Sequence, residues 1–225
     1  RLWVSTVNGM ALYTEQDSFK RIPMESMSRN SVQIIEDKSG RIYINTQVSI
    51  AVYDEQEGKF KDLLSMADGT LPMAGQCFIT PSDDLLIATS VDIKIYDSSS
   101  MKVKATINHE SYPNYLTMLP DGKIWMASYE GLSIYDTVSS SFEAIPAALK
   151  THRRLSGSTI SYIYPYGDNL ILINTDNDGL FAYNETEGTL RHQSESGFPF
   201  PVPDVKINCM FTDSRNNLWI GTLDQ

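Results

Sequence analysis

The sequence has few of the residues that build redox or metal centres, with only two cysteines and three histidines among 225 residues. Cys77 and Cys209 occupy matching places in two separate copies of an internal repeat, which predicts two buried free thiols rather than a disulfide. His109, His152 and His192 lie between copies and do not have the spacing of metal ligands. We therefore expect no metal and no cofactor in this chain.

Long apolar runs and an excess of positive charge are also missing. No apolar stretch approaches the roughly 20 residues of a membrane-spanning helix, and residues 1–4 do not resemble a signal peptide. There are 18 basic and 28 acidic residues, a formal charge of −10. Because this charge repels phosphate backbones and anionic lipid surfaces, we expect a chain that binds no nucleic acid and does not lie in a membrane.

What the sequence does contain is a repeat. A five-residue pattern recurs, made of an aliphatic residue, a bulky apolar residue, a second aliphatic residue, a small residue and a hydroxyl residue. Its copies are spaced by about 40, 43, 39, 47 and 47 residues, which is typical of propeller blades. The copies are Leu2 to Thr6, Ile42 to Thr46, Leu85 to Thr89, Ile124 to Ser128, Ile171 to Thr175 and Leu218 to Thr222.

Each repeat is interpreted as four strands, A to D. The five-residue pattern is strand B, preceded by strand A and a polar turn such as 37–40 or 213–216. Strand C ends at a tyrosine, and strand D carries an apolar residue six or seven positions later. The tyrosines are Tyr13, Tyr53, Tyr96, Tyr135 and Tyr183, and the strand D markers are Phe19, Phe60, Phe142, Leu190 and the degenerate stretch Met101 to Val103.

Strand B is apolar at both odd and even positions, so that both of its faces should be buried, as in stacked blades. The aromatic second position (Trp3, Tyr43, Trp125, Trp219) should press on a neighbouring blade, and the fourth position stays small to admit a neighbour. The predicted fold is all-β, a β-propeller of four-stranded antiparallel blades with about five blades present. The expected boundaries are strands B to D at 1–30, full blades at about 31–72, 73–112, 113–156 and 157–203, and strands A and B at 204–225.

The chain opens in strand B of one repeat and stops after strand B of another, which is not a whole number of blades. A propeller ring has no exposed edges only when its blades are complete. We therefore expect a piece of a longer array, a fragment of a seven-bladed ring.

Three runs of the sequence resemble the two-component regulator propeller repeat. They are D-S-R-N-N-L-W-I-G-T from Asp213, D-K-S-G-R-I-Y-I-N-T from Asp37 and D-G-K-I-W-M-A-S-Y-E-G-L-S-I-Y-D from Asp121. This resemblance implies a periplasmic sensor region of a Bacteroidetes hybrid two-component system, joined across the inner membrane to a histidine kinase and response regulator. It also implies a second propeller and a β-sandwich in the same receptor, a homodimer, and an oligosaccharide ligand released from a complex glycan.

Candidate ligand contacts should come from loops carried by the rigid blades, on the face where D to A connections and B to C turns emerge. The connection Ala144 to Ser158 carries a basic cluster of Lys150, His152, Arg153 and Arg154, suited to a carboxylate or sulfate of an acidic sugar. A solvated loop, or a contact with another domain, is the alternative interpretation.

Further candidates are Tyr112, Tyr129 and Phe198, whose rings could stack on a sugar or fix their loops, and Asp176 in a B to C turn. Asn174, Asp176, Asp178 and Gly179, followed by Glu185, also fit a calcium-loop pattern, but the surrounding strands favour a hairpin turn one residue longer than the others.

Catalytic patterns are missing as well: no G-x-S-x-G occurs, and the acidic residues mostly fall in turns. The sequence thus predicts no catalytic residues, and a non-catalytic sensor that recognises a glycan-derived oligosaccharide and signals to a kinase controlling polysaccharide-utilisation genes. A protein-interaction propeller and a propeller lyase or glycosidase are the alternatives.

Overall fold

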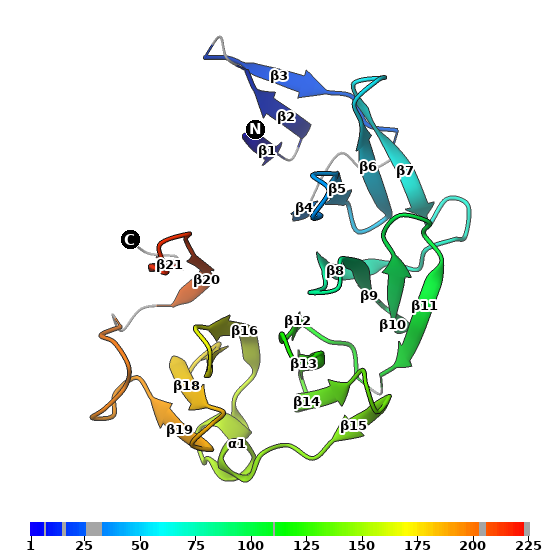
Figure 1. Cartoon of the computed structure of the whole chain (residues 1–225). Helices are drawn as coiled ribbons and strands as arrows, with labels where there is room; N and C mark the ends of the chain where they lie inside the picture. Colours follow the sequence, from blue (N-terminus) through cyan, green and yellow to red (C-terminus); the bar gives the residue numbers. More distant parts are fainter. Residues whose placement is uncertain (7, 15–16, 26–32, 110, 203–205, 223–225) are drawn as a thin grey trace. The chain divides into compact units, whose positions relative to one another are not determined.

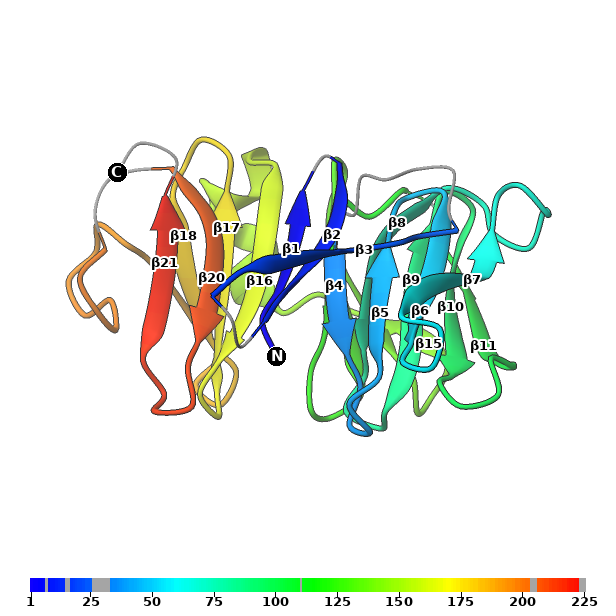
Figure 2. The same ribbon diagram turned by 90° about the horizontal axis from the view of Figure 1, so that it is seen from above.

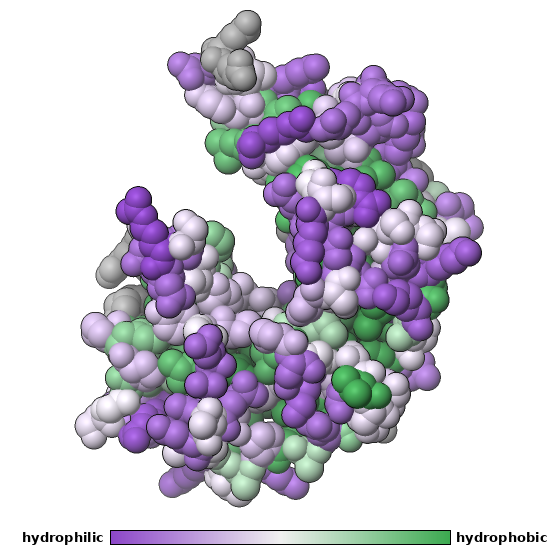
Figure 3. All heavy atoms as spheres, viewed as in Figure 1, coloured by the Kyte–Doolittle hydropathy of each residue, from purple (hydrophilic) through white to green (hydrophobic). Residues whose placement is uncertain are grey.

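A computed structural model describes residues 1–6, 8–14, 17–25, 33–109, 111–202 and 206–222 of the chain (Figure 1). It divides into two compact units, residues 1–112 and 113–225, which are described in turn. Within the described residues, no helix is both long enough and apolar enough to cross a membrane. Hydrophilic residues predominate on the surface seen in Figure 3.

The first unit contains three antiparallel sheets, and each is built from strands that follow one another along the chain (Figure 1). The first sheet has β1 (Trp3–Thr6), β2 (Gly9–Tyr13) and β3 (Phe19–Ile22). The second has β4 (Gln33–Glu36), β5 (Ile42–Asn45), β6 (Ser49–Asp54) and β7 (Lys59–Ser65). The third has β8 (Ala74–Ile79), β9 (Asp84–Thr89), β10 (Asp92–Asp97) and β11 (Val103–Asn108).

The second unit repeats this arrangement. Its first sheet has β12 (Tyr115–Met118), β13 (Lys123–Ser128), β14 (Gly131–Asp136) and β15 (Ser141–Glu143). A connection with α1 (Ala147–Thr151) and the 3-10 turn η1 (Leu155–Gly157) leads to a sheet of β16 (Ile160–Tyr166), β17 (Leu170–Thr175), β18 (Leu180–Asn184) and β19 (Thr189–His192). The last pair is β20 (Ile207–Thr212) and β21 (Leu218–Thr222). The four-strand order predicted from the repeat is thereby confirmed.

Within each unit the sheets stack face to face and enclose apolar cores (Figure 2). Strand β5 is buried at every position, and so is β9. In the first unit, Ile44 packs towards the first sheet while Tyr43 packs towards the third. The prediction that both faces of strand B are buried is correct for β5, whose sheet has a neighbour on both sides within its unit, whereas β1 and β21 keep partly exposed positions.

The small fourth position of the repeated pattern has a role that the sequence did not reveal. Where it is asparagine, its side-chain amide links two sheets: Asn45 Nδ2 donates to the Gly75 carbonyl at 2.7 Å, and Asn174 Nδ2 donates to the Ile207 carbonyl at 3.3 Å. Both acceptors lie in or at the first strand of the following sheet. A buried amide that is hydrogen-bonded in this way holds neighbouring blades in register.

The hydroxyl at the fifth position closes the turn that follows strand B. Thr175 Oγ1 donates to the Gly179 carbonyl at 3.0 Å and accepts the Asp178 amide N–H at 3.0 Å. Thr6 makes the same pair of bonds with Gly9 and Asn8. The pattern ends in a hydroxyl residue because the turn needs both a donor and an acceptor at that point.

One expectation about the cysteines is wrong. Cys77 is buried, at 1% exposure, as predicted, but Cys209 is exposed. Cys209 pairs across the strands with Gly221, which has no side chain to shield the thiol. It lies on the same face as Phe211 and Trp219, each 62% exposed, and so faces solvent rather than a core.

Candidate ligand-binding site

The base of the site is the connection between β15 and β16, which the sequence predicted as a loop. Its residues 147–151 form α1, and Leu149 and Leu155 insert into the core shared by the two four-stranded sheets of the second unit. A five-residue helix is not stable by itself, so this packing is what holds it. The anchored leucines place His152, Arg153 and Arg154 on a fixed base.

His192, at the end of β19, organises the polar side of the site. Its ring is 6% exposed, and its Nε2 lies 2.7 Å from the Asp178 carbonyl oxygen. A carbonyl can only accept, so Nε2 carries the hydrogen and Nδ1 is an acceptor. Nδ1 accepts from the Ser194 backbone N–H at 3.2 Å and lies 3.0 Å from Arg154 Nη1. The Nδ1 lone pair therefore orients the guanidinium, and an imidazole, unlike a carboxylate, leaves its positive charge in place.

Arg154 lines a cavity of about 460 Å³, which Asp178, His192, Ser194 and Val202 also line. The guanidinium forms no ion pair with any residue that the structure describes. The Asp178 carboxylate instead accepts the Ser158 hydroxyl, which also faces the Arg154 carbonyl at 2.7 Å. The arrangement leaves an oriented cation at an open cavity, which is the chemistry that an anionic group requires.

Gly179 is required where the β17–β18 turn meets the end of β19. Its φ is +73°, and a Cβ there would lie 2.8 Å from Gln193 Oε1. That oxygen is held in place, because it accepts the Leu180 backbone N–H at 2.7 Å. A glycine therefore lets the Gln193 side chain lie against the turn and form one wall of the cavity.

The predicted basic cluster is only partly brought together. Arg154 lines the cavity, whereas Lys150 and Arg153 are exposed and do not line it. The His152 ring packs edge-on against Phe181, with ring centroids 5.2 Å apart, and its Nε2 lies 3.9 Å from a Glu195 carboxylate oxygen. Its Nδ1 is buried and has no hydrogen-bond partner in the described part of the chain.

Two other predicted residues lie beside the cavity rather than in it. Asp176 lies in the same turn as Asp178, and one of its carboxylate oxygens is 4.0 Å from Lys206 Nζ. Phe198 packs against Phe200, with ring centroids 5.4 Å apart, and both rings lie against the core beneath β20. Phe198 therefore fixes its loop to the sheet, which is one of the two roles expected for it.

The predicted tyrosines lie elsewhere. Tyr129, in the β13–β14 turn, is 81% exposed and forms no aromatic pair with a described residue. Tyr112 belongs to the first unit, where its hydroxyl fills the space that a side chain at Gly75 would occupy, 2.1 Å from the position of a Cβ. Burial raises the pKa of Tyr112, in keeping with a packing role.

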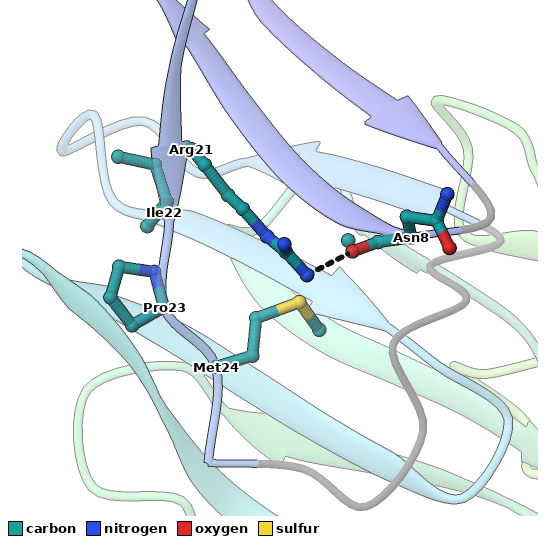
Figure 4. A pocket seen from close by; sticks show the side chains of 6 residues that line it. Asn8, Arg21, Ile22, Pro23 and Met24 are labelled. Atoms are coloured by element: carbon teal, nitrogen blue, oxygen red, sulfur yellow. Dashed lines mark hydrogen bonds between the residues drawn. The ribbon is translucent and has the colours of Figure 1, made fainter.

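A smaller cavity in the first unit, of 330 Å³, lies at the corresponding turn and strand end (Figure 4). There the guanidinium of Arg21 reaches across to the Asn8 carbonyl, at 2.8 Å, above Met24. The hydrogen bond is made to the backbone of its own turn, and Ile22 and Pro23 supply the rest of the wall. This cavity offers less to an anionic ligand than the one at Arg154.

The calcium-like pattern forms a hairpin turn, as interpreted from its neighbours: Thr175 ends β17 and Leu180 begins β18. The Asn174 side-chain amide is engaged with Ser161 and Ile207. No group of three histidine, cysteine or acidic side chains that could hold a metal ion occurs among the described residues.

The sequence missed His192, Asp178 and Gln193 as parts of the site. The sequence places His192 in a connection between repeats, whereas it ends β19, and nothing local shows that its ring meets a turn 14 residues earlier. The pairing of β18 with β19 creates that contact. The extra residue in the β17–β18 turn was the available signal, since it enlarges the turn that accepts the His192 ring.

Comparison with known proteins then identifies the repeat. Residues 201–224 match the family model described as two component regulator propeller. The resemblance read from the sequence is confirmed. No curated protein matches the sequence.

Solved structures similar to this chain have the same repeat architecture. The extracellular domain of BT3049, described as a hybrid two component system from B. thetaiotaomicron, has a TM-score of 0.73 and 20% identity, over 98% of this chain and 30% of that one. The extracellular domain of BT4673, described likewise, gives 0.72 and 18%, over 98% and 32%. Virginiamycin B lyase from Staphylococcus aureus gives 0.71 and 13%, over 98% and 73%.

These similarities show that the chain has a propeller fold, into which about five blades fit, as predicted. The chain spans about a third of the length of the two B. thetaiotaomicron structures. Since a lyase shares the fold, the fold does not decide between sensing and catalysis, and that choice depends on the site.

Proposed function

We propose that this chain is a non-catalytic, ligand-sensing part of a hybrid two-component receptor, and that it recognises a glycan-derived oligosaccharide carrying an acidic group. The two-component regulator propeller repeat at 201–224 supports the receptor assignment, as do the extracellular sensor-system domains that share the fold. In this proposal the chain lies on the periplasmic side of the inner membrane.

The observation that carries the ligand assignment is the environment of Arg154. Its guanidinium is oriented by the His192 ring, faces a cavity of 460 Å³ and has no carboxylate partner in the described residues. A planar guanidinium pairs well with the two oxygens of a carboxylate or sulfate. An acidic sugar would supply that group, and its hydroxyls would find the Asp178, Ser194 and Gln193 polar groups nearby.

Signalling would follow from a shift between two arrangements of the receptor ectodomain, which also contains a second propeller and a β-sandwich and acts as a homodimer in this proposal. A ligand shifts such an equilibrium only if it binds one arrangement more tightly than the other. The histidine kinase and the polysaccharide-utilisation genes would lie downstream of that shift.

Isothermal titration calorimetry tests the ligand class. The probes are an oligogalacturonide, a sulfated chondroitin disaccharide and a neutral malto-oligosaccharide of similar length. We expect binding of at least one acidic probe and weaker or no binding of the neutral one. Arg154→Ala should weaken acidic-probe binding by about tenfold or more, because a charge-assisted hydrogen bond contributes about 1.5–3 kcal/mol.

The matched control is Arg215→Ala, which removes an exposed arginine from the β20–β21 turn and should leave the affinity unchanged. Equal affinity for acidic and neutral probes, or equal losses in both variants, would contradict the acidic-ligand assignment. Appearance of unsaturated or shortened sugar products during incubation would contradict the non-catalytic one.

A further inference from the structure

Asn8 and Gly9 form the only Asn-Gly pair in the sequence, and they lie where β1 turns into β2. In such a pair the backbone nitrogen of glycine can attack the side-chain carbonyl carbon of asparagine, because glycine has no side chain to obstruct the approach. Asn8 is exposed, and the φ of Gly9 is +120°. Whether the attack occurs depends on two things, the acidity of the Gly9 N–H and the freedom of the Asn8 side chain.

Arg21 acts on the first of these. Its Nη2 donates to the main-chain carbonyl oxygen of Asn8 at 2.8 Å (Figure 4). That oxygen and the Gly9 nitrogen belong to one peptide group, so a negative charge formed on the nitrogen is shared with the oxygen. A guanidinium on the oxygen stabilises this anion, as the donors of an oxyanion hole do. Gly9 is buried beside Met24, where water screens the interaction less than at the surface.

The Asn8 side chain has the required freedom. Its amide forms no hydrogen bond with any residue that the structure describes, and it points away from Arg21 in Figure 4. The backbone of the turn is held instead, because Thr6 Oγ1 accepts the Asn8 N–H at 3.2 Å and donates to the Gly9 carbonyl at 2.9 Å. An unrestrained side chain thus lies beside a fixed and polarised peptide group. Four other asparagine side chains are held by hydrogen bonds: Asn45, Asn174, Asn184 and Asn217.

We propose that this turn modifies itself: the Gly9 nitrogen attacks the Asn8 side-chain carbonyl carbon, and Arg21 stabilises the peptide anion that attacks. The new C–N bond closes a succinimide ring. The bond from that carbon to the side-chain nitrogen breaks, and ammonia leaves with the proton that the Gly9 nitrogen gave up through solvent. Water then adds to one of the two ring carbonyls and opens the ring to aspartate or isoaspartate. One water is consumed and one ammonia is released, with no oxidant or reductant.

The products change the cavity of 330 Å³ that Asn8 and Arg21 line. Either product replaces a neutral amide by a carboxylate near the guanidinium, which favours an ion pair between them. In isoaspartate the backbone runs through the side chain and is one atom longer, so the carbonyl that Arg21 holds is displaced. The modification alters the charge of this cavity permanently and does not depend on the proposed sensing function.

Peptide mapping of the full chain by mass spectrometry, after incubation at mildly alkaline pH, tests the proposal. Trypsin releases residues 2–20 as a peptide in which Asn8 is the only asparagine. We expect this peptide to gain the mass difference between an amide and a carboxyl group faster than peptides that carry other asparagines. Arg21→Met should slow the gain by about threefold to tenfold, the effect of one lost hydrogen bond. Arg21→Lys, which keeps the charge, should recover part of the rate.

The matched control is Arg191→Met, which removes an exposed arginine that also donates to a backbone carbonyl, that of Ser196 at 3.3 Å. It should leave the rate at Asn8 unchanged. Unfolding in urea provides a second control, since Arg21 is 13 residues from Asn8 in the sequence and only the fold holds them together. The unfolded wild-type chain and unfolded Arg21→Met should therefore react at the same rate.

Far-ultraviolet circular dichroism checks that the variants are folded. No mass gain in the folded wild-type chain would overturn the proposal. Equal rates for the folded wild-type chain and folded Arg21→Met would do so too, as would a difference between them that persists in urea.

Discussion

The residues of the five-residue pattern illustrate what a repeated sequence pattern can and cannot reveal. Its hydroxyl and aromatic positions were recognised from repetition alone, and the structure assigns each a hydrogen bond or a packing contact. The asparagines at the fourth position were predicted only to be small enough for a neighbour. Asn45 and Asn174 instead donate to a carbonyl of the next sheet. That partner lies in or at a strand about 30 residues later, and only the stacking of sheets brings it close.

This role of asparagine leads to the first prediction. Asn174→Ala should lower the free energy of unfolding by about 1–3 kcal/mol, because it leaves the buried Ile207 carbonyl and the Ser161 hydroxyl without the amide. The control Asn169→Ala, at an exposed position in the β16–β17 turn, should change it by less than about 0.5 kcal/mol. Urea unfolding measures both, and equal effects would show that the amide does not link the sheets.

The two cysteines lead to a second prediction. Burial raises the pKa of the Cys77 thiol to about 12, so it is neither accessible nor ionised in the folded chain, whereas Cys209 is exposed. Ellman's reagent should therefore modify one thiol rapidly in the native protein and the second only on unfolding. Cys209→Ser should remove the rapid phase. A native protein in which both thiols react at the same rate would contradict the burial of Cys77.

At the scale of elements, the strands were predictable and the helix was not. Strand B can be located because its short run of apolar residues, at both odd and even positions, occurs six times in the sequence. Residues 147–151 occur once and are too few for helix propensity to decide their conformation. Their helix depends on Leu149 entering a core formed by two sheets, and that core is not visible in the local sequence.

The turn at Gly179 leads to a prediction with a built-in comparison. Gly179→Ala and Gly188→Ala both place a side chain at positive φ, +73° and +63° respectively, which costs about 1 kcal/mol each. At Gly188 no atom lies within 4 Å of the new Cβ, whereas at Gly179 it meets the held Gln193 side chain. We therefore expect Gly179→Ala to be the more destabilising by about 1 kcal/mol, the value of a lost hydrogen bond.

Denaturant unfolding of the two alanine variants provides the measurement. Acidic-probe titration adds a second one, since Gln193 forms a wall of the cavity that Arg154 lines. Gly179→Ala should weaken binding, and Gly188→Ala should not. Equal stability of the two variants would mean that Gln193 moves aside without cost.

For the whole molecule, the order of the sheets could be predicted because the same strand pattern recurs along the chain, and within each unit an aromatic residue of strand B packs against the tyrosine of the next sheet. The candidate site could be predicted only in part, because its groups come from three loops that have no shared pattern. Arg154 was identified from local charge. The Asp178 carbonyl, in a turn, is hydrogen-bonded to the His192 ring, at the end of a strand. The local sequence of neither segment predicts that contact.

The acidic turns of the molecule determine how its stability should depend on pH. Hydrogen bonds in three turns lower the pKa of an aspartate. Asp97 accepts from Ser99 and Ser100. Asp136 accepts from the Val138 amide, and Asp213 accepts from the Asn217 side chain and the Trp219 indole. Each carboxylate has a lower pKa in the folded chain than in the unfolded chain. The unfolded chain therefore binds more protons as the pH falls, and the folded state loses stability.

The opposing effect is charge repulsion. A chain of formal charge −10 is relieved of repulsion when acidic residues are protonated, which favours the folded state. That repulsion acts over long distances and is screened by salt, whereas the turn hydrogen bonds are short and are lost directly on protonation. We therefore expect the urea midpoint at moderate salt to be constant near neutral pH and to fall progressively below about pH 5. Asp97→Asn should show a shallower fall than the wild-type chain, and a midpoint that rises on acidification would mean that repulsion is the larger effect.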